Sequence, residues 1–72
     1  MKFIEKAKIR ITNWMEHNHH HQKEYEQFAD QLEREGKTKS AVSIREMAAL
    51  TSKSNEALRL ALESLEMDNK QN

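Results

Sequence analysis

Four histidines fall within five consecutive residues, at positions 17, 19, 20 and 21. Each residue of a helix turns by about 100°, so His17 and His21 lie one turn apart on one face, as do His20 and Glu24. Two imidazoles at this spacing can share one divalent ion, and a carboxylate can add an oxygen ligand. Imidazole suits nickel or zinc better than calcium or magnesium. The sequence therefore predicts a transition-metal site, and its candidate ligands are His17, His21, Glu24 and His20.

A purely structural interpretation of the same region stays open. Asn18 and His21 fall on the inward face of their predicted helix, where Asn55 and Thr51 of a second helix would lie opposite. A polar pair at such a position fixes helix register at a cost in stability. The alternative function is thus a structural or protein-interaction module with a polar layer of Asn18, Asn55 and Thr51. Histidines packed there could also act as proton sensors in mildly acidic solution.

Two long amphipathic helices are predicted to position these residues. Inward-facing residues recur at alternating spacings of three and four, which is a heptad repeat. We call each line of inward-facing residues a seam. The first predicted seam is Ile4, Ala7, Ile11, Trp14, Asn18, His21, Tyr25, Phe28 and Leu32. The second predicted seam is Ala41, Ile44, Ala48, Thr51, Asn55, Leu58, Leu62 and Leu65.

The break between the two helices is predicted at Gly36. The chain holds no proline and this single glycine, which suits the left-handed position that ends a helix. Thr38 or Ser40 can cap the helix that follows. A short loop makes the helices antiparallel neighbours, so the expected fold is all-α, an antiparallel two-helix hairpin forming one domain. The expected ranges are a helix over about 3–35, a loop over about 36–38 and a helix over about 39–67, within a domain of 1–72.

Folding the chain at Gly36 also predicts a register. The pairs are Leu32 with Ala41, Phe28 with Ile44, Tyr25 with Ala48, His21 with Thr51, Asn18 with Asn55, Trp14 with Leu58, and Ile11 with Leu62. Apolar residues then face apolar residues, and the two polar midsections fall opposite each other. Two independent stretches of sequence agree on this pairing, which supports it.

A second apolar stripe runs beside the second seam, and a lone hairpin would leave it in water. Small residues at this spacing let another helix approach closely. We expect a homodimer that forms a four-helix bundle, with a helix of another protein as the alternative partner. The stripe is Met47, Leu50, Ser54, Ala57 and Ala61.

Composition excludes several function classes. The 72 residues carry 12 basic and 12 acidic side chains, so no basic excess points to nucleic acid or an anionic membrane surface. We expect no membrane association and a cytoplasmic protein, because no long apolar run or signal peptide is found. The absence of cysteine excludes thiolate sites. We expect no enzyme, since Asn18 stands where helical zinc proteases carry their glutamate base.

A longer motif accompanies the histidines. Residues 14–21 read Trp-x-x-His-Asn-x-x-His, and the later elements of the pattern are Phe28-Ala29, Gly36, Ala48, Asn55 and Ala61-Leu62. The pattern covers about residues 10–66 and resembles a family of small uncharacterised helical-hairpin domains of bacteria and archaea. Such domains occur alone or attached to a small nickel-binding protein linked to carbon monoxide dehydrogenase maturation. The resemblance implies a shared polar site at His17, Asn18, His21 and Asn55 and adds some weight to nickel; His19 and His20 lie outside its pattern.

Overall fold

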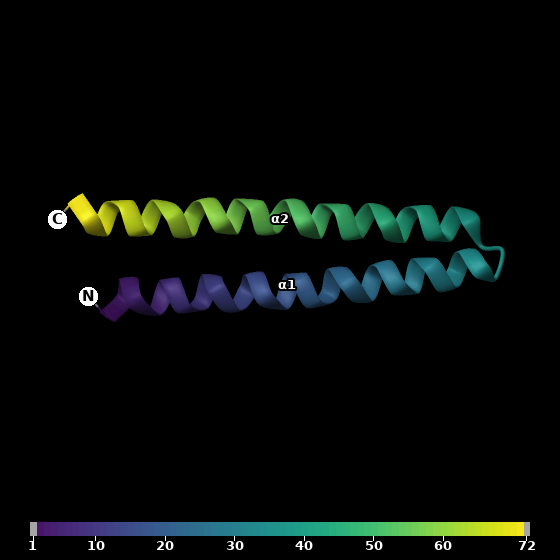
Figure 1. The fold of residues 1–72 in the computed structure, drawn as a ribbon, viewed down its shortest axis with the longest axis horizontal. Coiled ribbons are helices and arrows are strands. Elements are labelled where there is room, and N and C mark those ends of the chain that lie inside the picture. Colours follow the sequence, from purple (N-terminus) through teal and green to yellow (C-terminus); the bar gives the residue numbers. More distant parts are fainter. Residues whose placement is uncertain (1, 72) are drawn as a thin grey trace.

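The computed structural model describes residues 2–71, with side chains described for residues 2–67. It consists of two helices, α1 (Lys2–Arg34) and α2 (Thr38–Gln71), which run antiparallel and side by side (Figure 1). Within the described range neither helix is long and apolar enough to cross a membrane. The expected all-α antiparallel hairpin is confirmed, and α2 continues beyond the predicted end at about residue 67.

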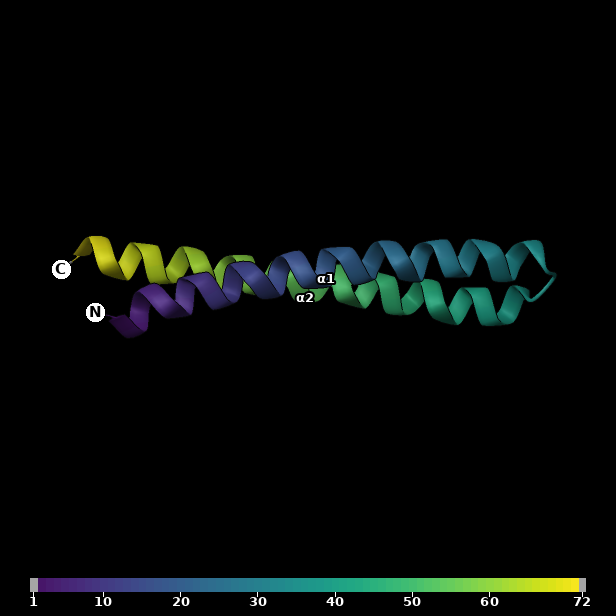
Figure 2. The same ribbon diagram turned by 90° about the horizontal axis from the view of Figure 1, so that it is seen from below.

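The hairpin is a rod about five times longer than it is thick, with extents of 56 × 15 × 11 Å. Seen from below, α1 crosses in front of α2 near mid-length, so the helices wind around each other (Figure 2). This winding is the consequence of a seven-residue repeat, because 3.6 residues per turn do not divide evenly into seven. Residues of one seam therefore stay in contact with the other seam along the rod.

The turn that ends α1 is built around Gly36. Its backbone has a φ of 80°, a left-handed conformation that glycine adopts without strain. The Gly36 amide donates to the Glu33 carbonyl at 3.0 Å, and the Lys37 amide donates to the Leu32 carbonyl at 2.8 Å. These two bonds form a Schellman motif, which satisfies the last carbonyls of the helix. The predicted role of Gly36 is confirmed.

The start of α2 differs from the prediction. Thr38 is already the first helical residue, and the Ala41 amide donates to the Lys37 carbonyl at 3.0 Å. Lys37 is therefore the N-cap residue, and the expectation that Thr38 or Ser40 caps α2 is wrong. The reason is geometric. The Schellman turn ends at Lys37, and this residue directly precedes Thr38, the first residue of α2.

The core of the hairpin is made of small side chains. Ala29, Ala41 and Ala48 are buried, and their size lets the two backbones approach closely. Among the described residues no large side chain is fully buried, and the other seam residues are half-buried or exposed. The two helices thus share a narrow line of contact, which leaves much apolar surface in water.

Seven of the nine predicted seam residues of α1 are half-buried, but the helix is rotated so that the other two lie outside. Trp14 and Phe28, expected to face inward, are 51% and 52% exposed. Their C-terminal neighbours take the inner places, since Met15 is half-buried and Ala29 is fully buried. The small Ala29 allows closer helix contact than Phe28 would, so the helix turns this side toward α2. The predicted seam of α2, by contrast, is buried or half-buried throughout.

Charged side chains gather along one edge of the hairpin. Arg45 of α2 bridges to Asp30 at 2.8 Å and to Glu33 at 2.6 Å on α1. Hydrogen bonds from Arg45 to these two carboxylates raise the pKa of its guanidinium. Such exposed pairs add little stability, but these two mark the edge along which ion pairs link α1 and α2.

Candidate metal site

His17 and His21 meet on one face of α1, near the middle of the helix. The two Nε2 atoms are 3.1 Å apart, and the ring centroids are 4.4 Å apart. Helical side chains lean toward the N-terminus, which carries His21 back over the turn that bears His17. Two imidazoles on one tetrahedral zinc ion have nitrogens about 3.3 Å apart, from zinc–nitrogen distances of about 2.0–2.1 Å. The separation of the two Nε2 atoms is therefore close to the one that a shared zinc ion would require.

Glu24 holds the other side of the His21 ring. The His21 Nδ1 donates to Glu24 Oε1 at 3.0 Å. With its proton on Nδ1, a neutral His21 presents the Nε2 lone pair toward His17. Metal-binding histidines commonly donate their second ring N–H to a carboxylate in this way. The structure thus places Glu24 behind the ring, where it orients His21, rather than beside the two Nε2 atoms as an oxygen ligand.

His20 and His19 are not joined to the pair. His20 Nε2 lies 3.6 Å from the other carboxylate oxygen of Glu24, and its side chain is 71% exposed. The ring centroids of His20 and His21 are 6.2 Å apart, and His19 is exposed. Among the described residues no group of three or more His, Asp or Glu side chains is arranged to hold one ion. Of the four predicted ligands, the structure therefore brings together the ring nitrogens of His17 and His21 only.

Tyr25 supports the His21 ring, a contact that sequence reasoning did not identify. The two rings are stacked, with centroids 5.9 Å apart and planes 12° apart. Tyr25 follows His21 by one helical turn, so the spacing alone could have indicated this contact. Sequence reasoning assigned Tyr25 to the core instead, where it is half-buried. Stacking and the hydrogen bond to Glu24 together restrict how far the His21 ring can turn.

The predicted polar layer lies between the helices but is connected differently. Asn55 Nδ2 donates to the Met15 carbonyl at 2.9 Å, and the buried Asn55 Oδ1 has no protein partner among the described residues. Thr51 donates to the Met47 carbonyl of its own helix at 2.9 Å. The rotation of α1 brings Met15 toward α2, so Asn55 reaches this backbone carbonyl and makes no hydrogen bond with the half-buried Asn18 in the described part of the chain.

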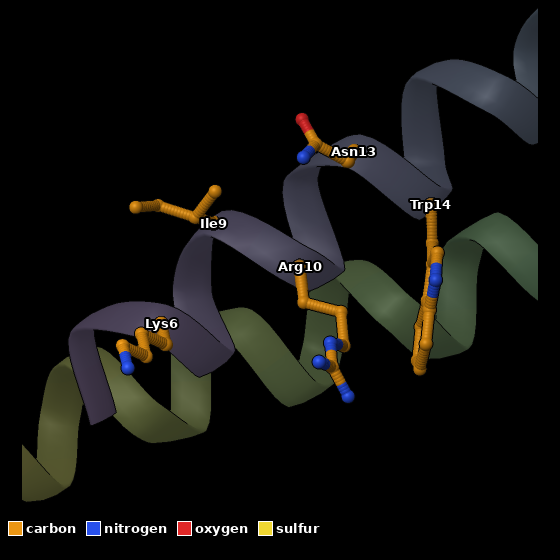
Figure 3. A pocket seen from close by; sticks show the side chains of 5 residues that line it. All are labelled: Lys6, Ile9, Arg10, Asn13 and Trp14. Atoms are coloured by element: carbon orange, nitrogen blue, oxygen red, sulfur yellow. The ribbon is translucent and has the colours of Figure 1, made fainter. Parts of the chain in front are cut away.

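A shallow hollow lies on α1 just before the histidine pair. Its lining residues are Lys6, Ile9, Arg10, Asn13 and Trp14. Arg10 and Trp14 extend toward the side where α2 lies, whereas Ile9 and Asn13 point away from α2 (Figure 3). An aromatic ring and a guanidinium thus lie exposed on α1 close to His17.

The fold and the site together define a helical hairpin with a histidine pair on an exposed face. The model of a family described as a domain of unknown function (DUF8180) matches residues 7–65, and the chain belongs to this family. Neither a curated protein nor a solved structure matches the chain. The matched range includes His17, His21, Glu24 and Asn55. The family description names no activity, so the link to carbon monoxide dehydrogenase maturation stays a prediction.

Proposed function

We propose that this hairpin is a non-enzymatic domain that binds a divalent transition-metal ion through the Nε2 atoms of His17 and His21. The observation that carries the proposal is the 3.1 Å approach of these two atoms. The hydrogen bond between His21 Nδ1 and Glu24 supports it, because it leaves the inner nitrogen free to coordinate. Zinc and nickel are the candidate ions, since both accept imidazole nitrogen readily.

Binding replaces a hydrogen bond that the pair makes without metal. With the His21 proton on Nδ1, His17 Nε2–H donates to the lone pair of His21 Nε2. A metal ion needs the Nε2 lone pairs of both rings, so the proton of a neutral His17 must move from Nε2 to Nδ1. Metal binding to histidine is therefore weaker in acidic solution, where the rings are protonated. Two ligands leave other positions of the ion open to water or to a donor from another molecule.

The first prediction tests the ligands directly. Calorimetric titration of zinc and of nickel into the full chain should give a saturable binding heat. A His17→Ala/His21→Ala variant should lose that heat, because both nitrogens are removed. A His19→Ala/His20→Ala variant is the matched control, since it also lacks two histidines but keeps the pair. Equal heats for all three proteins, or an equal loss in both variants, would contradict the proposal.

A second candidate function is a protein-interaction module, which the thin alanine core favours. Its polar layer would then set helix register, with Asn55 as the residue that reaches across to α1. Among the residues that the structure describes, the buried side-chain oxygen of Asn55 has no partner, an arrangement that lowers stability.

The second prediction follows from that buried oxygen. Asn55→Leu should raise the unfolding free energy by about 1 kcal/mol, because the Met15 carbonyl keeps its own helical hydrogen bond. Loss of the polar group should also let the helices pair in more than one register, so sedimentation velocity should show a mixture of association states. Thermal unfolding followed by circular dichroism gives the stability, with the exposed Ser52→Leu as control. A variant that is less stable and still a single species would refute this role for Asn55.

A further inference from the structure

One broad face of the hairpin carries almost no charge. On α2, residues at alternating spacings beside the seam are all uncharged, and they run along Met47, Leu50, Ser54, Ala57, Ala61 and Ser64. Charged residues of the same stretch lie on the other sides of the helix. Met47 and Leu50 are exposed. Depletion of charge with exposed apolar side chains is typical of the centre of an interface.

The row on α1 that contains the histidine pair borders the same face. Phe28 shares a surface hollow with Ser40 and Ser43 of α2, and these serines continue the uncharged row that leads to Met47. The ion pairs of Arg45 lie along the opposite edge. One row of α1 contains Trp14, His17, His21 and Phe28, at successive spacings of three, four and seven residues. The rings of Trp14 and Phe28 are exposed. The same row also carries the charged Arg10 and Glu24. The histidine pair thus borders the uncharged stripe of α2 and lies away from the ion pairs of Arg45.

We propose that a second copy of this chain covers the face, related by a two-fold axis that crosses the hairpin at mid-length. Each α1 then packs antiparallel against the partner's α1, with His17 at the axis. The facing pairs are Arg10 with the partner's Glu24, Ala7 with the partner's Phe28, and Trp14 with the partner's His21. An isologous contact must be self-complementary. Here opposite charges face each other, and the small Ala7 receives a large ring.

The same axis gives a complementary contact between the two copies of α2. Antiparallel packing about residues 55–56 pairs each large side chain with a small one. The facing pairs are Leu50 with the partner's Ala61, Met47 with the partner's Ser64, and Ser54 with the partner's Ala57. Both centres lie at one level of the rod, since Asn55 bonds to the Met15 carbonyl, one turn or less from His17. One symmetry operation therefore satisfies both helices.

The dimer deepens the proposed metal-binding function and rests on it. With His17 at the axis, the two His17 side chains face each other, and each His21 ring leans back toward this level, because its Nε2 lies 3.1 Å from that of its own His17. Two chains then supply up to four imidazole nitrogens, the number that closes a tetrahedral zinc site. The expected stoichiometry is one zinc ion for two chains.

Sedimentation equilibrium of the full chain, with and without zinc, tests the association. The wild type should be a dimer and should bind one zinc per dimer. Ala57→Glu puts a charge on the face and should shift the chain to monomer. Ala49→Glu, an identical change on an exposed position away from the face, should remain a dimer. The core of the monomer is thin, so a glutamate could unfold the hairpin instead of only separating the dimer. A second measurement therefore uses variants that add no charge.

Cysteine pairs provide that second measurement, because the natural chain has no cysteine. Ser54→Cys/Ala57→Cys should form a covalent dimer under mild oxidation, whereas Ala49→Cys/Ser52→Cys should not. A wild-type chain that stays monomeric with and without zinc, or equal cross-linking of both cysteine variants, overturns the dimer. One zinc per chain in a dimer overturns the shared site. A dimer that binds no zinc refutes the metal function but leaves the docking face standing.

Discussion

Replacing Ala48 by leucine is expected to force the two helices apart and to destabilise the hairpin by about 3 kcal/mol, the upper part of the range for overpacked cores. Ala48 is only 3% exposed, and it is one of three buried alanines along the helix contact. The added methyl groups have no cavity to enter, since the opposing backbone is already close. In a domain of this size, 1 kcal/mol corresponds to about 4–8 °C in melting temperature, so the midpoint should fall by more than 10 °C.

Ala49→Leu is the matched control for this change. Ala49 is exposed, and both substitutions replace alanine by leucine within the same helix, so their helix propensities change equally. Thermal and urea unfolding followed by circular dichroism should show a large loss of stability for Ala48→Leu and little change for Ala49→Leu. Equal midpoints would mean that the alanine line does not set the distance between the helices.

The hairpin could be predicted because its signals repeat along the chain. Alternating spacings of three and four recur in both halves, and Gly36 is the only glycine, so length, number and direction of the helices follow. Helix rotation could not be predicted in the same way. Trp14 and Met15 are neighbouring apolar residues, and so are Phe28 and Ala29, so at these two places the pattern does not decide which residue faces inward. The structure favours the one with Ala29, because close approach depends on side-chain size and not on hydrophobicity alone.

The candidate site could also be predicted only in part. Helical spacing brings His17 and His21 together whatever the rotation of the helix. The same spacing places Glu24 within reach of both His20 and His21, and sequence cannot say which ring the carboxylate takes or which nitrogen it contacts. Side-chain rotamers decide this, and they give Glu24 the Nδ1 of His21 at 3.0 Å and a longer 3.6 Å contact to His20. In the proposed metal site, this difference makes Glu24 a group that orients His21 and not a ligand of the ion.

The contact between Glu24 and His21 leads to a prediction on metal affinity. Glu24→Ala is expected to weaken zinc binding by about 10–100-fold, as for other carboxylates that orient a metal-bound histidine. Without the carboxylate, the Nδ1 proton of His21 loses its acceptor, and the tautomer with a free Nε2 is no longer favoured. Glu26→Ala is the matched control, because Glu26 contacts Gln22 and not the histidine pair. Competition titration with a zinc indicator measures both affinities.

Glu24→Gln separates the orienting role from that of a ligand. A glutamine oxygen can still accept a hydrogen bond from His21 Nδ1, but it is a much poorer metal ligand than a carboxylate. If Glu24 orients the ring, the glutamine variant should bind zinc more tightly than the alanine variant, with an affinity between those of alanine and wild type. If Glu24 coordinates the ion, both variants should lose affinity to the same extent. Wild-type affinity in Glu24→Ala would show that neither role exists, and that His17 and His21 bind the ion without help from Glu24.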